Sequence, residues 1–155
     1  MTDTPRPLLH RFTIDPIPAR KVEALARRAA PGRYEDEPIP DHIQSAVTLA
    51  ETEGDRVRLS GGGQDLWFPA RVPRPIWFGM ARGYSAHLAG VYTLPGFVEI
   101  PPGGTVVDCG AFVGGFSIAA ARAGARVIAV EPAPLSFDCL TRNTAGLAVE
   151  CANLG

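Results

Sequence analysis

The sequence has little cysteine, almost no excess of charge of either sign, and no hydrophobic run long enough to cross a membrane. Its three cysteines, Cys109, Cys139 and Cys151, are widely spaced and form no CxxC pair, so we expect neither a disulfide framework nor a zinc site. The net charge of −1 argues against a binder of nucleic acid or anionic membranes. The N-terminus also lacks the apolar region of a secretory signal. The sequence therefore predicts a cytoplasmic protein without nucleic-acid or membrane partners.

The first part of the chain, residues 1–100, predicts an arm, a helix, a β-hairpin and an approach segment. Residues 1–17 are rich in proline and show little periodicity, which is typical of a loosely ordered arm. From Pro18 to Ala30 the apolar side chains recur at helical spacing, and Pro31-Gly32 follows as a stop signal. One amphipathic helix is therefore expected near the N-terminus.

A β-hairpin is expected between residues 46 and 68. The pattern indicates short strands at Ala46–Ala50, Arg56–Leu59 and Leu66–Phe68, with the glycines of Ser60–Gln64 as a turn. A group of large apolar residues follows or overlaps the last strand. We interpret these residues as core or as contacts between the two parts of the chain; they are Trp67, Phe68, Trp77, Phe78 and Met80.

The second part, residues 101–155, alternates short apolar runs with helical segments. Strands are expected at Thr105–Cys109, Arg126–Glu131 and Leu147–Ala152, and helices at Phe116–Ala123 and 135–145. Such runs are typical of buried parallel strands, and the cysteines within these elements are expected to be small buried side chains. The order predicts an α/β fold, in which the helix and hairpin region precedes the first βαβαβ part of a Rossmann-like sheet.

The turn after the first of these strands carries the candidate site. Asp108 closes that strand, and Gly110 and Gly114 allow a sharp bend and the close approach of a ligand. Glu131 closes the next strand, where a carboxylate can accept hydrogen bonds from both hydroxyls of a ribose. Because ligands of doubly wound folds bind at this edge of the sheet, the sequence predicts a nucleoside cofactor.

The sign of charge distinguishes two such cofactors. A nicotinamide dinucleotide favours G-x-G-x-x-G, with its pyrophosphate on the helix N-terminus, but Phe112 stands where the second glycine is needed. Asp108 would also repel the anionic pyrophosphate. The same carboxylate suits S-adenosylmethionine (SAM), which has no phosphate and carries an ammonium and a sulfonium. The charge pattern therefore favours SAM.

The segments PPGGTVVDCGAFVGGFS and RVIAVEPAPLSFDCLTRN resemble the FkbM-type branch of class I SAM-dependent methyltransferases. D-x-G-x-x-x-G, with an acid closing the second strand, is similar to motif I of that class. Two positions depart from the branch: Phe112, where asparagine is usual, and Gly115, where a larger residue is common. The resemblance covers roughly residues 90–155. The matching positions are Gly103, Val106, Val107, Asp108, Gly110, Ala111, Gly114, Phe116, Ser117, Glu131, Pro132, Pro134, Phe137, Leu140 and Asn143.

The resemblance implies O-methylation of a hydroxyl on a small molecule, such as a sugar or a natural product. It implies no catalytic residue in this chain, because the family takes its acceptor-binding residues largely from later strands. With three strands after residue 101, the chain is expected to be a fragment that binds SAM weakly or not at all and is inactive by itself. The residues implied to bind SAM are Asp108, Gly110, Ala111, Gly114, Glu131 and Pro132.

Two alternatives stay open from the sequence. One is a noncatalytic interaction module on a partial Rossmann-like fold, with the hairpin and its aromatic residues as the contact surface. The other is a nicotinamide-dependent oxidoreductase, for which replacing Asp108 by asparagine should strengthen NADH binding. The sequence does not specify the acceptor, the general base or the oligomeric state.

Overall fold

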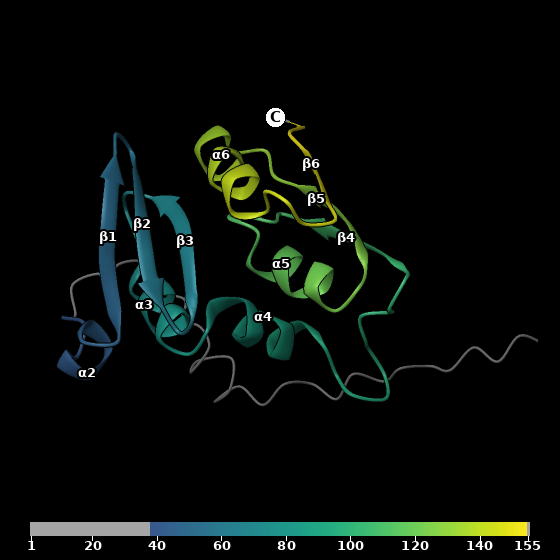
Figure 1. The fold of residues 1–155 in the computed structure, drawn as a ribbon, viewed down its shortest axis with the longest axis horizontal. Coiled ribbons are helices and arrows are strands. Elements are labelled where there is room, and N and C mark those ends of the chain that lie inside the picture. Colours follow the sequence, from purple (N-terminus) through teal and green to yellow (C-terminus); the bar gives the residue numbers. More distant parts are fainter. Residues whose placement is uncertain (1–37, 155) are drawn as a thin grey trace, which may run out of the picture. The chain divides into compact units, whose positions relative to one another are not determined.

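The computed structural model describes residues 38–154, which contain two three-stranded sheets and their connecting helices (Figure 1). The arm predicted at 1–17 and the helix predicted at Pro18–Ala30 lie outside the described residues. No helix within the described range is both long and apolar enough to cross a membrane. In chain order the elements are α2 (Asp41–Gln44), β1 (Val47–Glu53), β2 (Arg56–Gly61), β3 (Gln64–Pro69), α3 (Arg74–Ala81), α4 (Tyr84–Tyr92), β4 (Thr105–Cys109), α5 (Gly115–Arg122), β5 (Arg126–Val130), α6 (Pro134–Asn143) and β6 (Val149–Ala152).

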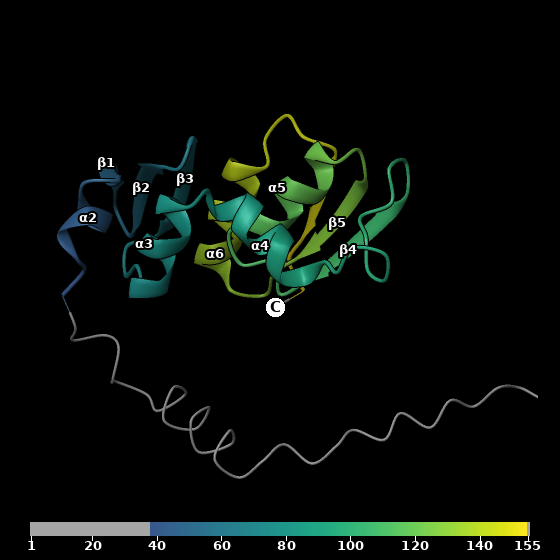
Figure 2. The same ribbon diagram turned by 90° about the horizontal axis from the view of Figure 1, so that it is seen from below.

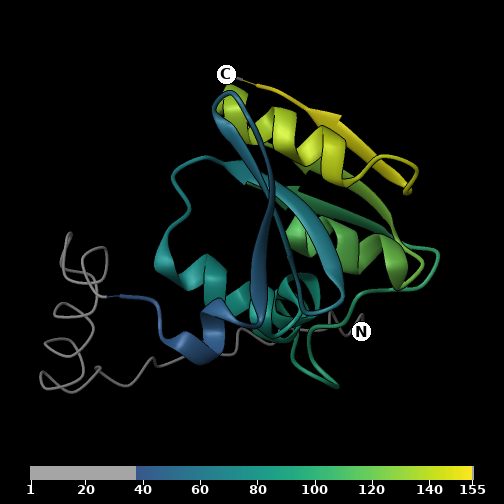
Figure 3. The ribbon, with the colours of Figure 1, turned by 60° about the vertical axis from the view of Figure 1, so that its left-hand side comes forward.

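The first sheet is an antiparallel meander in the order β1-β2-β3, drawn in Figure 3 as a twisted ribbon. Gly61 pairs with Gln64, so Gly62 and Gly63 form a two-residue turn, and both have the positive φ that such a turn requires. Val57 and Leu59 alternate with the half-buried Arg56 and Arg58 and point into the core. The three predicted strands are confirmed, but β2 and β3 continue into the predicted turn of Ser60–Gln64, which leaves only Gly62 and Gly63 as the turn.

The second sheet is parallel in the order β4-β5-β6, and α5 and α6 connect its strands (Figure 1). β4 has the predicted bounds, and the other strands and helices differ from their predicted bounds by one or two residues. Gly124, with φ +92°, follows the C-cap of α5 in the position that favours glycine. The α/β fold with a βαβαβ unit is therefore confirmed. The division of the chain into two parts at residue 101 rests on a change in the sequence pattern and stays a prediction.

The outward face of the parallel sheet corrects two predictions. Ala120 of α5 and Leu140 of α6 pack on the face of the sheet that carries Val127 and Ala129. Side chains alternate between the two faces of a strand, so Val107 and Cys109 of β4 lie on the other face, away from both helices. Val107 is 59% exposed, and Cys109 is exposed as well. The prediction of a fully buried β4 and of a buried Cys109 was wrong, because the described helices cover one face of the sheet. Cys139 is buried and Cys151 half-buried.

One hydrophobic cluster joins the two sheets. It contains Phe68 from β3, Tyr84 from α4, Ile118 from α5 and Cys139 from α6, and α4 lies alongside α5 (Figure 2). The rings of Phe68 and Tyr84 meet edge to face with centroids 5.4 Å apart. Phe68 and Met80 are buried, and Trp67 and Trp77 pack half-buried against the same cluster, as expected for core residues. Phe78 is half-buried but lies outside this cluster, and the Arg74 guanidinium lies over its ring.

Candidate functional site

The candidate site is the turn between β4 and α5, residues 110–115. Gly110 and Gly114 have φ values of +79° and +84°, so both provide the sharp bend predicted for them. The backbone N–H groups of Gly110 and Ala111 donate to the carbonyl oxygen of Val130 at 2.8 and 3.0 Å. The turn is therefore fixed to the carboxyl end of the neighbouring strand β5.

Asp108 lies half-buried near the end of β4 and reaches the first turn of α5. The hydroxyl of Ser117, which is fully buried, donates a hydrogen bond to Asp108 Oδ2 at 2.6 Å. A carboxylate oxygen has more than one acceptor position, so this bond leaves acceptor capacity on the group. The contact fixes the Asp108 side chain against the first turn of α5.

Glu131 approaches the same turn from β5. It is 7% exposed, and each of its carboxylate oxygens accepts one backbone N–H group. Phe112 N–H donates to Oε2 at 2.8 Å, and Ala133 N–H donates to Oε1 at 2.9 Å. The structure therefore places Glu131 in contact with the glycine-containing turn and Asp108 in contact with the first turn of the helix that follows it. Their role in binding a cofactor stays a prediction.

The glycines of the turn have different surroundings. A Cβ atom on Gly110 would meet nothing within 4 Å, whereas one on Gly114 would lie 2.6 Å from Leu140 Cδ1. A Cβ atom on Gly115 would lie 2.4 Å from Tyr84 Cε1. Gly110 leaves space at the surface, while Gly114 and Gly115 allow α6 and α4 to pack closely on the turn.

The remaining predicted residues contact the turn differently. Ala111 is 7% exposed and packs in the core cluster of the parallel sheet, and its N–H group is bonded to Val130. Pro132 is exposed, and its carbonyl oxygen accepts a hydrogen bond of 3.4 Å from Asn153. Both residues lie beside the acids, as the sequence order requires.

The backbone conformation of Phe112 bears on why the FkbM-type branch, which the sequence resembles, usually has asparagine at this position. Its φ of +53° makes it the single non-glycine residue with a positive φ among the described residues. Asparagine tolerates this conformation better than other side chains do, which gives a physical reason for asparagine at this position. The Phe112 ring instead packs with Phe68, at a centroid distance of 6.4 Å. The ring therefore points toward β3 and belongs to the core.

Ser117 and Asn143 are the residues of this region to which sequence reasoning gave no role. Both are matching positions of the resemblance, which was the available signal. Ser117 holds Asp108, and Asn143 bonds the carbonyl oxygen of Val113 within the turn at 2.9 Å. Their partners are set by the tertiary fold, so local spacing could not identify them.

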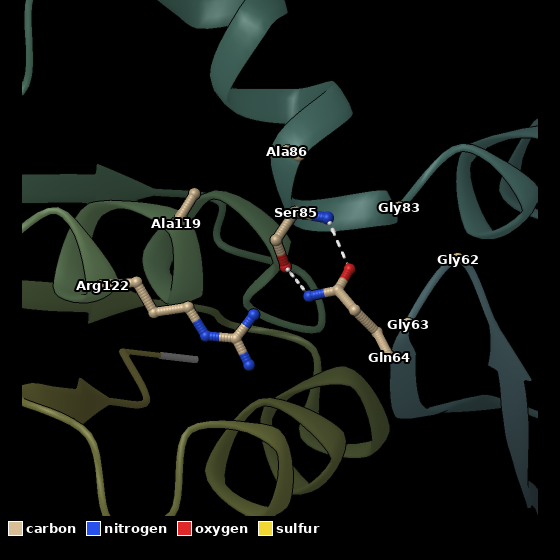
Figure 4. Close-up of a pocket in the computed structure, with 8 residues that line it drawn as sticks. All are labelled: Gly62, Gly63, Gln64, Gly83, Ser85, Ala86, Ala119 and Arg122. Atoms are coloured by element: carbon tan, nitrogen blue, oxygen red, sulfur yellow. Dashed lines mark hydrogen bonds between the residues drawn. The ribbon is translucent and has the colours of Figure 1, made fainter.

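A separate cavity of about 320 Å³ lies between the β2–β3 turn and α4 (Figure 4). The side-chain amide of Gln64 donates to the Ser85 hydroxyl at 2.8 Å, and its carbonyl accepts the Ser85 N–H at 2.9 Å. Gln64 thereby caps the first turn of α4. None of the predicted cofactor-binding residues lines this cavity, whose lining is Gly62, Gly63, Gln64, Gly83, Ser85, Ala86, Ala119 and Arg122.

No model of a known protein family matches this sequence, and no curated protein matches it. Among solved structures, a SAM-dependent methyltransferase from Agrobacterium tumefaciens is similar at 17% identity and a TM-score of 0.40 over 66% of this chain. A Pyrococcus horikoshii protein described as a transferase is similar at 20% identity and a TM-score of 0.44 over 65% of this chain. This chain spans about a third of the length of each, 33% and 37%.

Proposed function

We propose that this chain provides the SAM-binding turn of a methyltransferase that acts on a hydroxyl group of a small molecule, in the manner of the FkbM-type branch. One observation carries the proposal. Asp108 lies one residue before the end of β4, and Glu131 directly follows β5, the neighbouring parallel strand. Glu131 is hydrogen-bonded to the glycine-containing turn and Asp108 to the start of α5. Two acids around one nucleoside-binding turn favour a cationic cofactor over an anionic one.

The residues present fit SAM. Gly110 has open space where a side chain would stand, so a ligand can approach the backbone there. Backbone N–H groups orient the Glu131 carboxylate, whose remaining lone pairs can accept the ribose hydroxyls. Asp108, directed by Ser117, offers negative charge toward the cationic end of the cofactor. These contacts support SAM as the ligand of this turn.

SAM, when bound, supplies a methyl group on a positively charged sulfur. The residues of this chain have the task of binding and orientation: Glu131 fixes the ribose, and Asp108 fixes the charged end. Holding the donor in one geometry is a main source of rate enhancement in such a transfer. The hydroxyl acceptor also has to lose a proton, and we assign no residue of this chain to that step.

The test is an NMR titration of the full chain with SAM up to millimolar concentration. The range allows for the weak binding that the sequence led us to expect. We expect shifts of the backbone amides of Gly110, Ala111 and Gly114, with smaller changes in β1–β3. Asp108→Asn and Glu131→Gln should each weaken binding by about tenfold, since each removes one charge-assisted contact.

Glu150→Gln is the matched control, because Glu150 is an exposed acid of the same sheet that pairs with Arg126. It removes the same charge and should leave SAM binding unchanged. NADH serves as the comparison ligand. Shifts of the turn amides with NADH but not with SAM, or tighter NADH binding by Asp108→Asn, would contradict the proposal.

A further inference from the structure

Asn143, the last residue of α6, makes three hydrogen bonds to two segments that are distant in sequence. Its side-chain oxygen accepts the Trp67 N–H at 2.7 Å. Its Nδ2 group donates to the carbonyl oxygens of Trp67 and Val113, both at 2.9 Å. An asparagine amide has two N–H donors and one oxygen acceptor, so every donor and the acceptor of this side chain are in use.

The contact with Trp67 imitates strand pairing. β3 is an edge strand of the antiparallel sheet, and Trp67 lies within it. The Trp67 N–H and C=O groups both bond the Asn143 side chain, which gives them the acceptor and donor that a neighbouring strand would give. The amide thereby covers the edge of the sheet at this residue.

The third bond connects that edge to the candidate turn. Val113, a residue of the turn, is completely buried, and its carbonyl oxygen accepts the hydrogen bond from Asn143. Glu131 holds the turn at Phe112, one residue earlier. The turn is therefore fixed on one side by an acid of the parallel sheet and on the other by an amide bonded to the antiparallel sheet.

We propose that Asn143 is a positioning residue that holds the turn of residues 110–115 in its ligand-binding geometry by bonding it to β3. The consequence for SAM rests on the proposed function, whereas the effect on the turn does not. Asn143→Asp removes both donors and places a carboxylate against two carbonyl oxygens, so the link should fail. Asn143→Ser is the milder variant, with one donor retained.

A matched control weakens a different contact between α6 and the antiparallel sheet, one that does not reach the turn. Arg142, next to Asn143 in α6, donates to both carboxylate oxygens of Glu53 in β1, at 2.8 and 3.0 Å. Glu53→Gln removes the charge of that pair and leaves the Asn143 bonds in place. A loss that comes from loosening the two sheets in general should appear in this variant as well.

The experiment is amide hydrogen exchange of the full chain without ligand, followed by SAM titration of the same variants. In Asn143→Asp we expect the amides of Trp67, Phe112 and Gly114 to exchange about tenfold faster or more, beyond any change in global stability, and SAM binding to weaken about tenfold. Asn143→Ser should lie between that variant and the native chain. Glu53→Gln should leave these amides and SAM binding unchanged.

The two proposals fail in distinguishable ways. Unchanged exchange of the turn amides in both Asn143 variants, or equal acceleration in Glu53→Gln, would overturn the positioning role. If the native chain does not bind SAM while Asn143→Asp still releases the turn amides, the positioning role stands and the proposed function fails. Should Asn143→Asp not fold, the exchange pattern of Asn143→Ser decides.

Discussion

At the scale of single residues, Phe112 combines an unfavourable backbone conformation with favourable packing. A bulky side chain at φ +53° costs about 1–2 kcal/mol relative to ordinary backbone. Contact of the half-buried ring with Phe68 offsets this cost through removal of apolar surface from water. Packing of the ring therefore helps the chain to keep a positive φ at a position where the resemblance leads one to expect asparagine.

Comparing Phe112→Asn with Phe112→Ala separates the two effects. Both variants lose the ring, but asparagine adopts a positive φ more readily than alanine does. We expect the asparagine variant to be more stable than the alanine variant by about 1 kcal/mol in urea unfolding. Equal stabilities would show that the backbone at this position is not strained.

The positions of Asp108 and Glu131 could be predicted from the sequence, because each closes an apolar run and parallel strands end at one edge. The roles of Ser117 and Asn143 could not be predicted from spacing. Asn143 and Trp67 are separated by 76 residues, and no local pattern encodes such a partner. The same holds for Phe112, whose φ and ring contact depend on β3.

At the scale of secondary-structure elements, glycines decide how closely α4 approaches α5. Gly115 lies where Tyr84 and Leu88 of α4 pack, with no room for a methyl group. Gly90, in the last turn of α4, has nothing within 4 Å of its Cβ position. The two glycines therefore provide a matched pair of alanine substitutions in helices that pack on each other.

Gly115→Ala should destabilise the protein by about 1–3 kcal/mol, since the new methyl group pushes α4 away from α5. Gly90→Ala should stabilise it by about 0.5–1 kcal/mol, because alanine loses less conformational freedom in a helix. Thermal unfolding of both variants checks the pair. A loss of stability in both would mean that helix packing is not the cause.

The pattern of elements was predictable because apolar runs and glycine turns are local signals. The order of the strands and the place of the glycine turn follow from such signals, whereas the shortening of that turn to Gly62-Gly63 depends on the pairing of β2 with β3. The exposure of Val107 and Cys109 could not be predicted, because it depends on which elements cover the outward face of the sheet. Apolar composition alone does not distinguish a strand covered on both faces from a strand covered on one.

At the scale of the whole molecule, the shared core contains two groups that resist losing a proton. Burial raises the pKa of the Tyr84 hydroxyl to about 12, and burial raises the pKa of the Cys139 thiol to about 11. The ordinary values are 10.0 and 9.0. The folded state therefore retains both protons at a pH at which the unfolded chain has begun to release them.

The free energy of unfolding should fall as the pH rises above 9, and more steeply above 10, because the unfolded state then binds fewer protons than the folded state. At about pH 8 and below, both groups are protonated in the folded and in the unfolded state, so they should contribute almost no pH dependence there. Urea unfolding at a series of pH values measures the curve. Cys139→Ala should remove the decrease in the free energy of unfolding that begins near pH 9. An unchanged curve in that variant would contradict the assignment of this decrease to the Cys139 thiol.

The bonds between Trp67 and Asn143 also affect the order in which the protein can form during synthesis. A ribosome makes β3 before α6, and 76 residues separate the two partners. The edge of β3 therefore stays without its Asn143 contact until the 76 residues after Trp67 have been synthesised. The meander can pair its own strands early, but the turn beside Val113 acquires this connection only after residue 143 has emerged.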